Sequence, residues 1–156
     1  MEHSQLRKVE CSVHIKASGE KFLDLYSNKT HHIAKICPDK VQAVNIHKGE
    51  WGSVGSIISW NYVHEGKACV AKEVIEDIDK KNNKMIFKVI EGDLVEEFYK
   101  SFKLLLEVIP KGNGSEVHWV LEYEKQNDNV PDPHTILHFL THTSKDIDAY
   151  ITKDIK

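Results

Sequence analysis

The amino-acid sequence predicts an α+β domain in which a curved, seven-stranded antiparallel sheet is covered by one long C-terminal helix. Two observations lead to this prediction. Segments of alternating polar and apolar residues follow one another along most of the chain, and short polar turns connect them. The longest segment with helical spacing comes last. A sheet with one apolar face needs a cover, and an amphipathic helix supplies one.

Length and composition are those of one globular domain. With 156 residues, the chain is expected to form a single domain spanning residues 1–156. Its 40% hydrophobic and 29% charged residues are ordinary for such a protein. The longest apolar runs are far shorter than the roughly 20 residues of a membrane helix, so no membrane span is expected.

Charge and cysteine content restrict the partners and the location. The formal net charge is −3 and Arg7 is the only arginine, which argues against a nucleic-acid partner. The N-terminal residues lack the apolar core of a secretory signal, and the three cysteines favour free thiols in a reducing compartment. A cytoplasmic protein is therefore expected, and its oligomeric state stays open between a monomer and a weak dimer.

The first part of the chain predicts a strand followed by two short helices. Residues 5–15 alternate well enough for an edge strand. Residues 17–36 have helical spacing with a break near Ser27, and Ser18 is a candidate N-cap. Pro38 then stops the second helical piece.

Six further strands follow. They are expected at residues 41–47, 55–64, 67–78, 84–90, 94–109 and 116–125. Glu65 and Gly66 form a hairpin turn, since glycine adopts positive φ without steric cost. The polar turns 79–83 and 91–93 are also short, so neighbouring strands are expected to be antiparallel.

The long C-terminal helix is expected from Asp132, as N-cap, with Pro133 in the first helical position, to about Lys153. At about 1.5 Å per residue it is ~30 Å long, enough to cross a small domain. Its apolar side consists of Ile136, Leu140, Thr143, Ile147, Tyr150 and Ile151.

Alternation within the strands assigns side chains to two faces of the sheet. The face with the large apolar residues also carries Trp60, Tyr62, Trp119 and Tyr123, and parity places Lys100 there as well. Enclosed tryptophan and tyrosine need partners for their polar atoms. Aromatic walls with a few polar groups are typical of a small-molecule pocket, and a solid core is the alternative that the pattern leaves open.

Lys72 and Glu73 are neighbours in the strand at 67–78, so only one of them faces the interior. Parity with Val70 and Val74 favours Lys72, whereas a β-bulge would reverse the assignment. The sequence leaves this choice open.

Two other patterns are assigned to structure rather than to a site. His134, His138 and His142 stack on one side of the last helix, opposite its apolar residues, with no obvious carboxylate or cysteine to complete a metal site. No metal is therefore expected. The glycines at 49, 52 and 55 are assigned to a tight turn, because the lysine and hydroxyl of a phosphate loop are missing and a strand follows.

Residues 47–67 closely resemble the signature region of plant major latex proteins. Segments 31–38, 71–73, 87–93 and 122–125 are similar to the same family, so the resemblance runs through the chain. That family is a branch of the pathogenesis-related class 10 and birch-pollen-allergen superfamily. The resemblance implies the helix-grip fold, with a curved seven-stranded sheet wrapped around the long helix, two short helices in a V, and a large internal cavity for hydrophobic or amphipathic ligands.

The resulting hypothesis is a carrier or binding protein for a small plant metabolite of the sterol, flavonoid, hormone, alkaloid or lipid class. Its role would be in defence or development, with no cofactor. The expected ligand-binding residues are Phe22, His31, Ile58, Trp60, Tyr62, Val70, Glu73, Met85, Phe87, Lys100, Phe102, Trp119, Tyr123, Phe139, Leu140 and Thr143. For Glu73, this expectation rests on the wider superfamily, in which an acidic residue near this place contacts ligands.

Two alternatives stay open. One is an isomerase or cyclase acting on an alkaloid-like substrate in the same cavity, with Lys100, Glu73 and Tyr62 as the candidate acids and bases. No residue is assigned as catalytic. The other is a signalling module in which the turn at 47–55 and the loop at 91–93 respond to the ligand.

Overall fold

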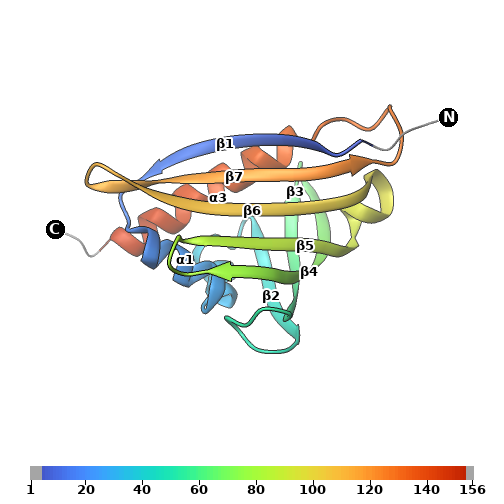
Figure 1. Cartoon of the computed structure of the whole chain (residues 1–156). Coiled ribbons are helices and arrows are strands. Elements are labelled where there is room, and N and C mark those ends of the chain that lie inside the picture. Colours follow the sequence, from blue (N-terminus) through green and yellow to red (C-terminus); the bar gives the residue numbers. More distant parts are fainter. Residues whose placement is uncertain (1–4, 154–156) are drawn as a thin grey trace.

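A long helix lies across a curved antiparallel sheet in the computed structural model, which describes residues 5–153 (Figure 1). Within these residues seven strands are hydrogen-bonded in the order β1-β7-β6-β5-β4-β3-β2, and each neighbouring pair is antiparallel. The predicted α+β helix-grip fold is confirmed. The predicted domain limits, residues 1 and 156, lie outside the described residues, so the single-domain assignment stays a prediction.

The elements expected from the sequence are present, with ends that shift by a few residues. The strands are β1 (Arg7–Ile15), β2 (Val41–Lys48), β3 (Ile57–His64), β4 (Lys67–Asp79), β5 (Lys84–Gly92), β6 (Tyr99–Lys111) and β7 (Gly114–Lys125). The helical elements are α1 (Gly19–Ser27), η1 (Thr30–His32), α2 (Ile33–Ile36), η2 (Leu94–Phe98) and α3 (His134–Thr152). Ser18 caps α1 as expected, its side chain accepting from the Lys21 N–H.

The predicted inner face of the sheet is buried. Met85, Phe87 and Val89 of β5 are at most 4% exposed, and the odd-numbered residues of β7 from Val117 to Tyr123 at most 1%. The glycines at 49, 52 and 55 have φ near +90° and lie in the β2–β3 turn, and β3 follows them, as expected.

Helix α3 differs from its prediction at both ends. It begins at His134, and Asp132 does not cap it, because the Asp132 carboxylate accepts a hydrogen bond from the Tyr123 hydroxyl. Near the other end Tyr150 is 43% exposed, so its assignment to the buried side is wrong. The buried side includes Ile136, Leu140, Thr143 and Ile147, together with Leu137 and Ser144.

Three polar contacts fix α3 relative to the sheet. The Trp119 indole N–H of β7 donates to Ser144 Oγ over 2.9 Å, inside the core. The Asp148 carboxylate accepts from the backbone N–H groups of Lys16 and Ala17, just after β1. Asp146 forms an ion pair with Lys40, 2.6 Å long, just before β2. Two of these contacts hold the helix on the β1–β7 side of the sheet, and the third ties it to the chain just before the opposite edge strand, β2.

The sheet divides between β5 and β6. Their ladder ends at the pair Lys88 and Lys103, while β5 continues to Gly92 and η2 leads the chain into β6. Gly92 has a φ of 118°, and a Cβ there would lie 2.2 Å from the Val70 carbonyl oxygen. Only glycine fits this close approach. The segment η2 was not expected, because residues 94–109 were predicted to form one strand.

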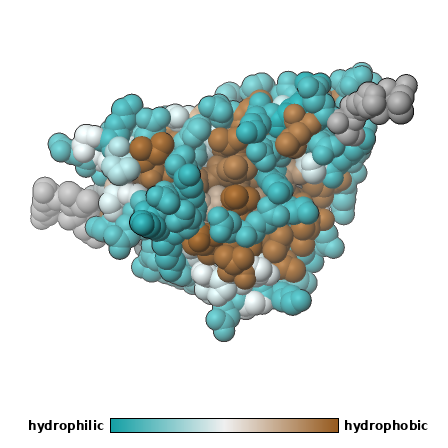
Figure 2. Space-filling view, viewed as in Figure 1, coloured by the Kyte–Doolittle hydropathy of each residue, from teal (hydrophilic) through white to brown (hydrophobic). Residues whose placement is uncertain are grey.

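Exposed apolar side chains lie near this division. Val70 of β4 is 49% exposed and Ile90 of β5 is 39% exposed. Figure 2 shows apolar surface over the middle of the face that is viewed in Figure 1.

Replacing Ser144 with alanine is expected to lower the free energy of unfolding by about 1–3 kcal/mol, because the Trp119 indole N–H would stay buried without a partner. Urea unfolding measures the change. Lys145→Ala, at the next and exposed position of α3, is the control and should change stability by less than about 0.5 kcal/mol. Equal effects of the two substitutions would contradict the assigned role of this hydrogen bond.

Candidate functional site

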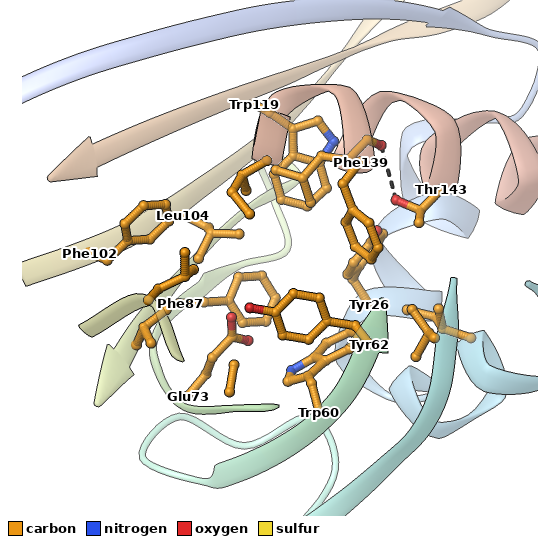
Figure 3. A pocket seen from close by; sticks show the side chains of 17 residues that line it. Tyr26, Trp60, Tyr62, Glu73, Phe87, Phe102, Leu104, Trp119, Phe139 and Thr143 are labelled. Atoms are coloured by element: carbon orange, nitrogen blue, oxygen red, sulfur yellow. Dashed lines mark hydrogen bonds between the residues drawn. The ribbon is translucent and has the colours of Figure 1, made fainter. Parts of the chain in front are cut away.

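A cavity lies between α3, the first helices and the inner face of the sheet (Figure 3). Its lining comes from α1, α2, α3, η2 and strands β2 to β7. The lining residues are Tyr26, Ile33, Val41, Trp60, Tyr62, Ala71, Glu73, Phe87, Val89, Leu94, Phe102, Leu104, Trp119, Ile136, Phe139, Leu140 and Thr143. Apolar and aromatic side chains dominate this list, which is the usual composition of a small-molecule pocket.

The cavity measures about 70 Å³. Known small-molecule sites enclose roughly 300–1,000 Å³. The large cavity implied by the family resemblance is therefore not open in this structure, and a ligand the size of a sterol needs walls that move apart.

Glu73 brings a carboxyl group into this apolar space. It lies on β4 and its side chain points into the cavity, as do Tyr62 and Trp60 from β3 (Figure 3). Burial raises the pKa of Glu73 to about 7. The nearby Trp60 indole N–H acts in the opposite direction and lowers the pKa of Glu73. The two groups do not form a hydrogen bond of normal geometry. Near neutral pH the carboxyl group is therefore divided between its neutral and ionised forms.

Two more polar atoms beside Glu73 lack a partner. Trp60 Nε1 and the Tyr62 hydroxyl oxygen are buried, and neither has a hydrogen-bond partner among residues 5–153. Burial also raises the pKa of Tyr62, so its hydroxyl keeps its proton at neutral pH. Unsatisfied buried polar groups each cost about 1–3 kcal/mol, and such groups are enriched where a ligand completes the structure.

The alternation in β4 decides between Lys72 and Glu73. Cys69, Ala71 and Glu73 face inwards, whereas Val70 lies on the outer face. The parity assignment that favoured Lys72 is wrong, because the valines of β4 are more exposed than its small inner residues. Lys72 instead forms an ion pair with Glu91, 2.9 Å long.

Comparisons with known proteins identify the family. A model described as the pathogenesis-related protein Bet v 1 family matches residues 4–154. MLP-like protein 31 of Arabidopsis thaliana is 48% identical over 149 residues, which are 94% of this chain and 86% of the relative. The chain belongs to the Bet v 1 family, in its major latex protein branch.

Other relatives agree with this assignment. MLP-like protein 34 of Arabidopsis thaliana is 50% identical over 145 residues, which are 92% of this chain and 46% of that protein. The chain thus spans about half the length of this relative, and the same holds for MLP-like protein 28, at 44%. The crystal structure of major latex-like protein 151 from Panax ginseng has a TM-score of 0.89 and 39% identity, covering 93% of this chain and 97% of that one.

A more distant Bet v 1-like structure shows the fold alone. Norcoclaurine synthase from Thalictrum flavum has a TM-score of 0.73 but 17% identity, covering 97% of this chain and 96% of the enzyme.

Many of the residues expected at the site line the cavity of this Bet v 1-family chain. They are Trp60, Tyr62, Glu73, Phe87, Phe102, Trp119, Phe139, Leu140 and Thr143. That they contact a ligand stays a prediction.

Several others are buried without reaching the cavity. Phe22, Ile58 and Met85 are fully buried, each 0% exposed, and pack elsewhere in the core. Tyr123 is 1% exposed, but its hydroxyl is engaged by Asp132. For Ile58, Met85 and Tyr123, which lie on strands, parity identified the inner face of the sheet correctly. Parity cannot tell which part of that face borders the cavity.

Val70, Lys100 and His31 lie outside the cavity. Lys100 is exposed because the register of β6 shifts between Tyr99 and Ser101. The same irregularity leaves Phe98 in η2 39% exposed, although its parity matched the inner face. The His31 ring stacks on Trp51 of the glycine-containing turn, with centroids 4.6 Å apart.

Sequence reasoning also missed part of the lining. These residues are Tyr26, Ile33, Val41, Ala71, Val89, Leu94, Leu104 and Ile136. Leu104, Val89 and Ile136 carried the right periodicity and were assigned to the core. Ala71 gave no signal of its own, because it lines the cavity by being small.

Two further findings concern other kinds of site. His134, His138 and His142 are exposed, and no cluster suited to a metal ion occurs among residues 5–153. None of the helices in this range is long and apolar enough to cross a bilayer.

Glu73→Gln is expected to raise stability in a pH-dependent manner. The folded state keeps the Glu73 proton up to about pH 7, whereas the unfolded chain releases it near the usual value of 4.5, so the wild type loses stability as pH rises through this interval. The variant has no such loss. Its advantage should be near zero at pH 4 and grow to as much as about 3 kcal/mol at pH 8.

Urea unfolding at several pH values measures this difference. Glu96→Gln, at an exposed position of η2, is the control and should follow the wild-type pH dependence. A constant difference between Glu73→Gln and wild type across the pH range would refute the assigned environment of Glu73.

Proposed function

We propose that this chain binds a small hydrophobic or amphipathic plant metabolite in the cavity beneath α3 and acts as its carrier or sensor. The observation that carries the proposal is an apolar cavity whose wall holds the buried carboxyl group of Glu73 beside two polar atoms, the Tyr62 hydroxyl oxygen and Trp60 Nε1, that have no hydrogen-bond partner among residues 5–153. A ligand would bury apolar surface against the wall and supply partners for these groups. We further propose a cytoplasmic location and a role in defence or development, supported by the pathogenesis-related family that the chain matches.

Binding of a metabolite requires the cavity to expand from its 70 Å³. Apolar burial contributes roughly 25 cal/mol per Å², part of which is consumed by opening the walls and by ordering the ligand. Two parts of the wall are the candidates for movement. One is the division between β5 and β6, where no ladder joins Val89 to Phe102. The other is Phe139, which lies between the cavity and an outer groove beside His138.

Filling the cavity is expected to weaken binding. Ala71→Leu places a larger side chain in the cavity and should weaken binding of a hydrophobic dye such as anilinonaphthalene sulfonate at least tenfold. The control is Val70→Leu, which introduces the same residue at the preceding position, where the side chain is 49% exposed. It should change the dissociation constant by less than twofold.

Fluorescence titration measures both constants, and circular dichroism checks the fold of each variant. If Ala71→Leu does not fold, Leu104→Phe is used in its place, because it fills the cavity from β6. Equal affinity of the cavity variants and wild type would place the dye on the surface and contradict the proposal.

A second candidate function is enzymatic, on an alkaloid-like substrate. A buried carboxyl group with a pKa of about 7 beside a tyrosine hydroxyl is suited to acid–base chemistry at neutral pH. Lys100, the third candidate named from the sequence, is exposed outside the cavity. Norcoclaurine synthase shares the fold, and at 17% identity it supports this alternative only weakly.

Mass spectrometry separates the carrier from the enzyme. Wild type and Glu73→Gln are each incubated with a plant metabolite extract, and both the bound and the free molecules are identified. A carrier is expected to enrich molecules that the extract already contained. New masses that form with wild type and not with Glu73→Gln would instead establish the enzyme.

A further inference from the structure

Glu73, Trp60 and Tyr62 share one patch of the inner sheet face. In the β3–β4 ladder Ile58 pairs with Glu73, Trp60 with Ala71 and Tyr62 with Cys69. Trp60 is therefore the diagonal neighbour of Glu73, a separation that long side chains bridge. Figure 3 shows the Glu73 carboxyl group, the Tyr62 hydroxyl and the Trp60 indole nitrogen turned toward the same part of the cavity.

This patch can donate three hydrogen bonds, beside the acceptor sites on its carboxyl and hydroxyl oxygens. An indole N–H donates only, a tyrosine hydroxyl donates one hydrogen, and a neutral carboxyl group donates one more. Neither Trp60 Nε1 nor the Tyr62 hydroxyl is paired within the described chain. Thr143, across the cavity, already donates to the Leu140 carbonyl oxygen over 3.0 Å. The patch thus offers up to three hydrogens and is surrounded by hydrocarbon.

We propose that Trp60, Tyr62 and Glu73 together bind one uncharged carbonyl oxygen of an otherwise apolar ligand. This inference rests on the proposed binding function and names the chemistry that the cavity selects. A carbonyl oxygen accepts two or three hydrogen bonds and donates none, which matches a patch of donors. A neutral carboxylic acid and a tyrosine in an apolar site form a known arrangement for holding such an oxygen. A ligand hydroxyl can also accept these hydrogen bonds, but its own hydrogen must then turn to an oxygen of Glu73 or Tyr62, so the preference over an alcohol is smaller than the preference over a hydrocarbon.

The protonation state of Glu73 sets this preference. The other titratable residues of the described cavity lining are Tyr62 on β3 and Tyr26 on α1, and burial raises the pKa of both. Both tyrosines therefore stay neutral at physiological pH. The lining residues from β5, β6, β7 and α3 carry no charge. Glu73, with a pKa of about 7, is thus the group that titrates, and above this pH its carboxylate repels a carbonyl oxygen and attracts an ammonium group.

Four bicyclic probes of nearly equal shape test the inference: 2-tetralone, 2-tetralol, tetralin and 2-aminotetralin. Their dissociation constants are measured by dye displacement at pH 6 and pH 8. At pH 6 the ketone should bind about tenfold more tightly than the hydrocarbon and several-fold more tightly than the alcohol. Between pH 6 and pH 8 its affinity should fall about tenfold, while that of the amine rises.

Substitutions test whether the patch of Trp60, Tyr62 and Glu73 causes the preference for the ketone. Tyr62→Phe should reduce the advantage of the ketone over tetralin several-fold, with both dissociation constants measured on the same variant. Glu73→Gln, whose amide still donates, should retain the preference for the ketone and remove its pH dependence. Tyr150→Phe removes an exposed hydroxyl of α3 outside the cavity lining and should leave the preference unchanged.

The infrared carbonyl stretch of bound 2-tetralone gives a measurement that needs no variant. It should shift to lower frequency than in hydrocarbon solvent, because the oxygen accepts hydrogen bonds. Equal affinity for all four probes, or an unshifted stretch, would overturn the carbonyl site and leave the proposed binding function intact. Failure of all four probes to displace the dye would refute the binding function, and the carbonyl site with it.

Discussion

The whole structure depends on how one helix covers a concave apolar sheet that is wider than the helix. The hydrogen bond from Trp119 to Ser144 and the contacts of Asp148 with the end of β1 draw α3 toward the β1–β7 side. Accordingly, α3 packs mainly against β1. The part of the inner face formed by β3 to β6 is then left at a distance from the helix, and the cavity lies there. The cavity is thus a geometric consequence of the position of α3 on one side of the sheet.

The cavity allows polar groups to be buried on the inner face of the sheet. A carboxyl group in a tightly packed apolar core would be strongly destabilising. Beside the cavity Glu73 avoids part of this penalty by staying protonated up to about pH 7, and the Tyr62 hydroxyl and Trp60 indole have no hydrogen-bond partner in the part of the chain that the structure describes. Native proteins break the local rules of burial chiefly at functional sites. This group of residues is therefore the polar centre of an otherwise apolar cavity.

Membership of the Bet v 1 family accounts for the fold, but it does not determine which ligand an individual member binds. The ginseng protein, at 39% identity, and norcoclaurine synthase, at 17% identity, have similar backbones. In this chain large aromatic residues reduce the cavity to about 70 Å³, so its selectivity depends on which walls can move as well as on the polar groups they carry.

The sequence by itself determined the elements, their order and the buried face of β5 and β7, because alternation and helical spacing are local properties of the chain. It did not determine which face of β4 turns inwards, since valines lie on its outer face and Glu73 on its inner one. Nor did it place Lys100, whose orientation follows from the irregular register beside η2. The size of the hollow was decided by tertiary structure alone, because it is the small difference between the space the sheet encloses and the volume of the side chains that fill it.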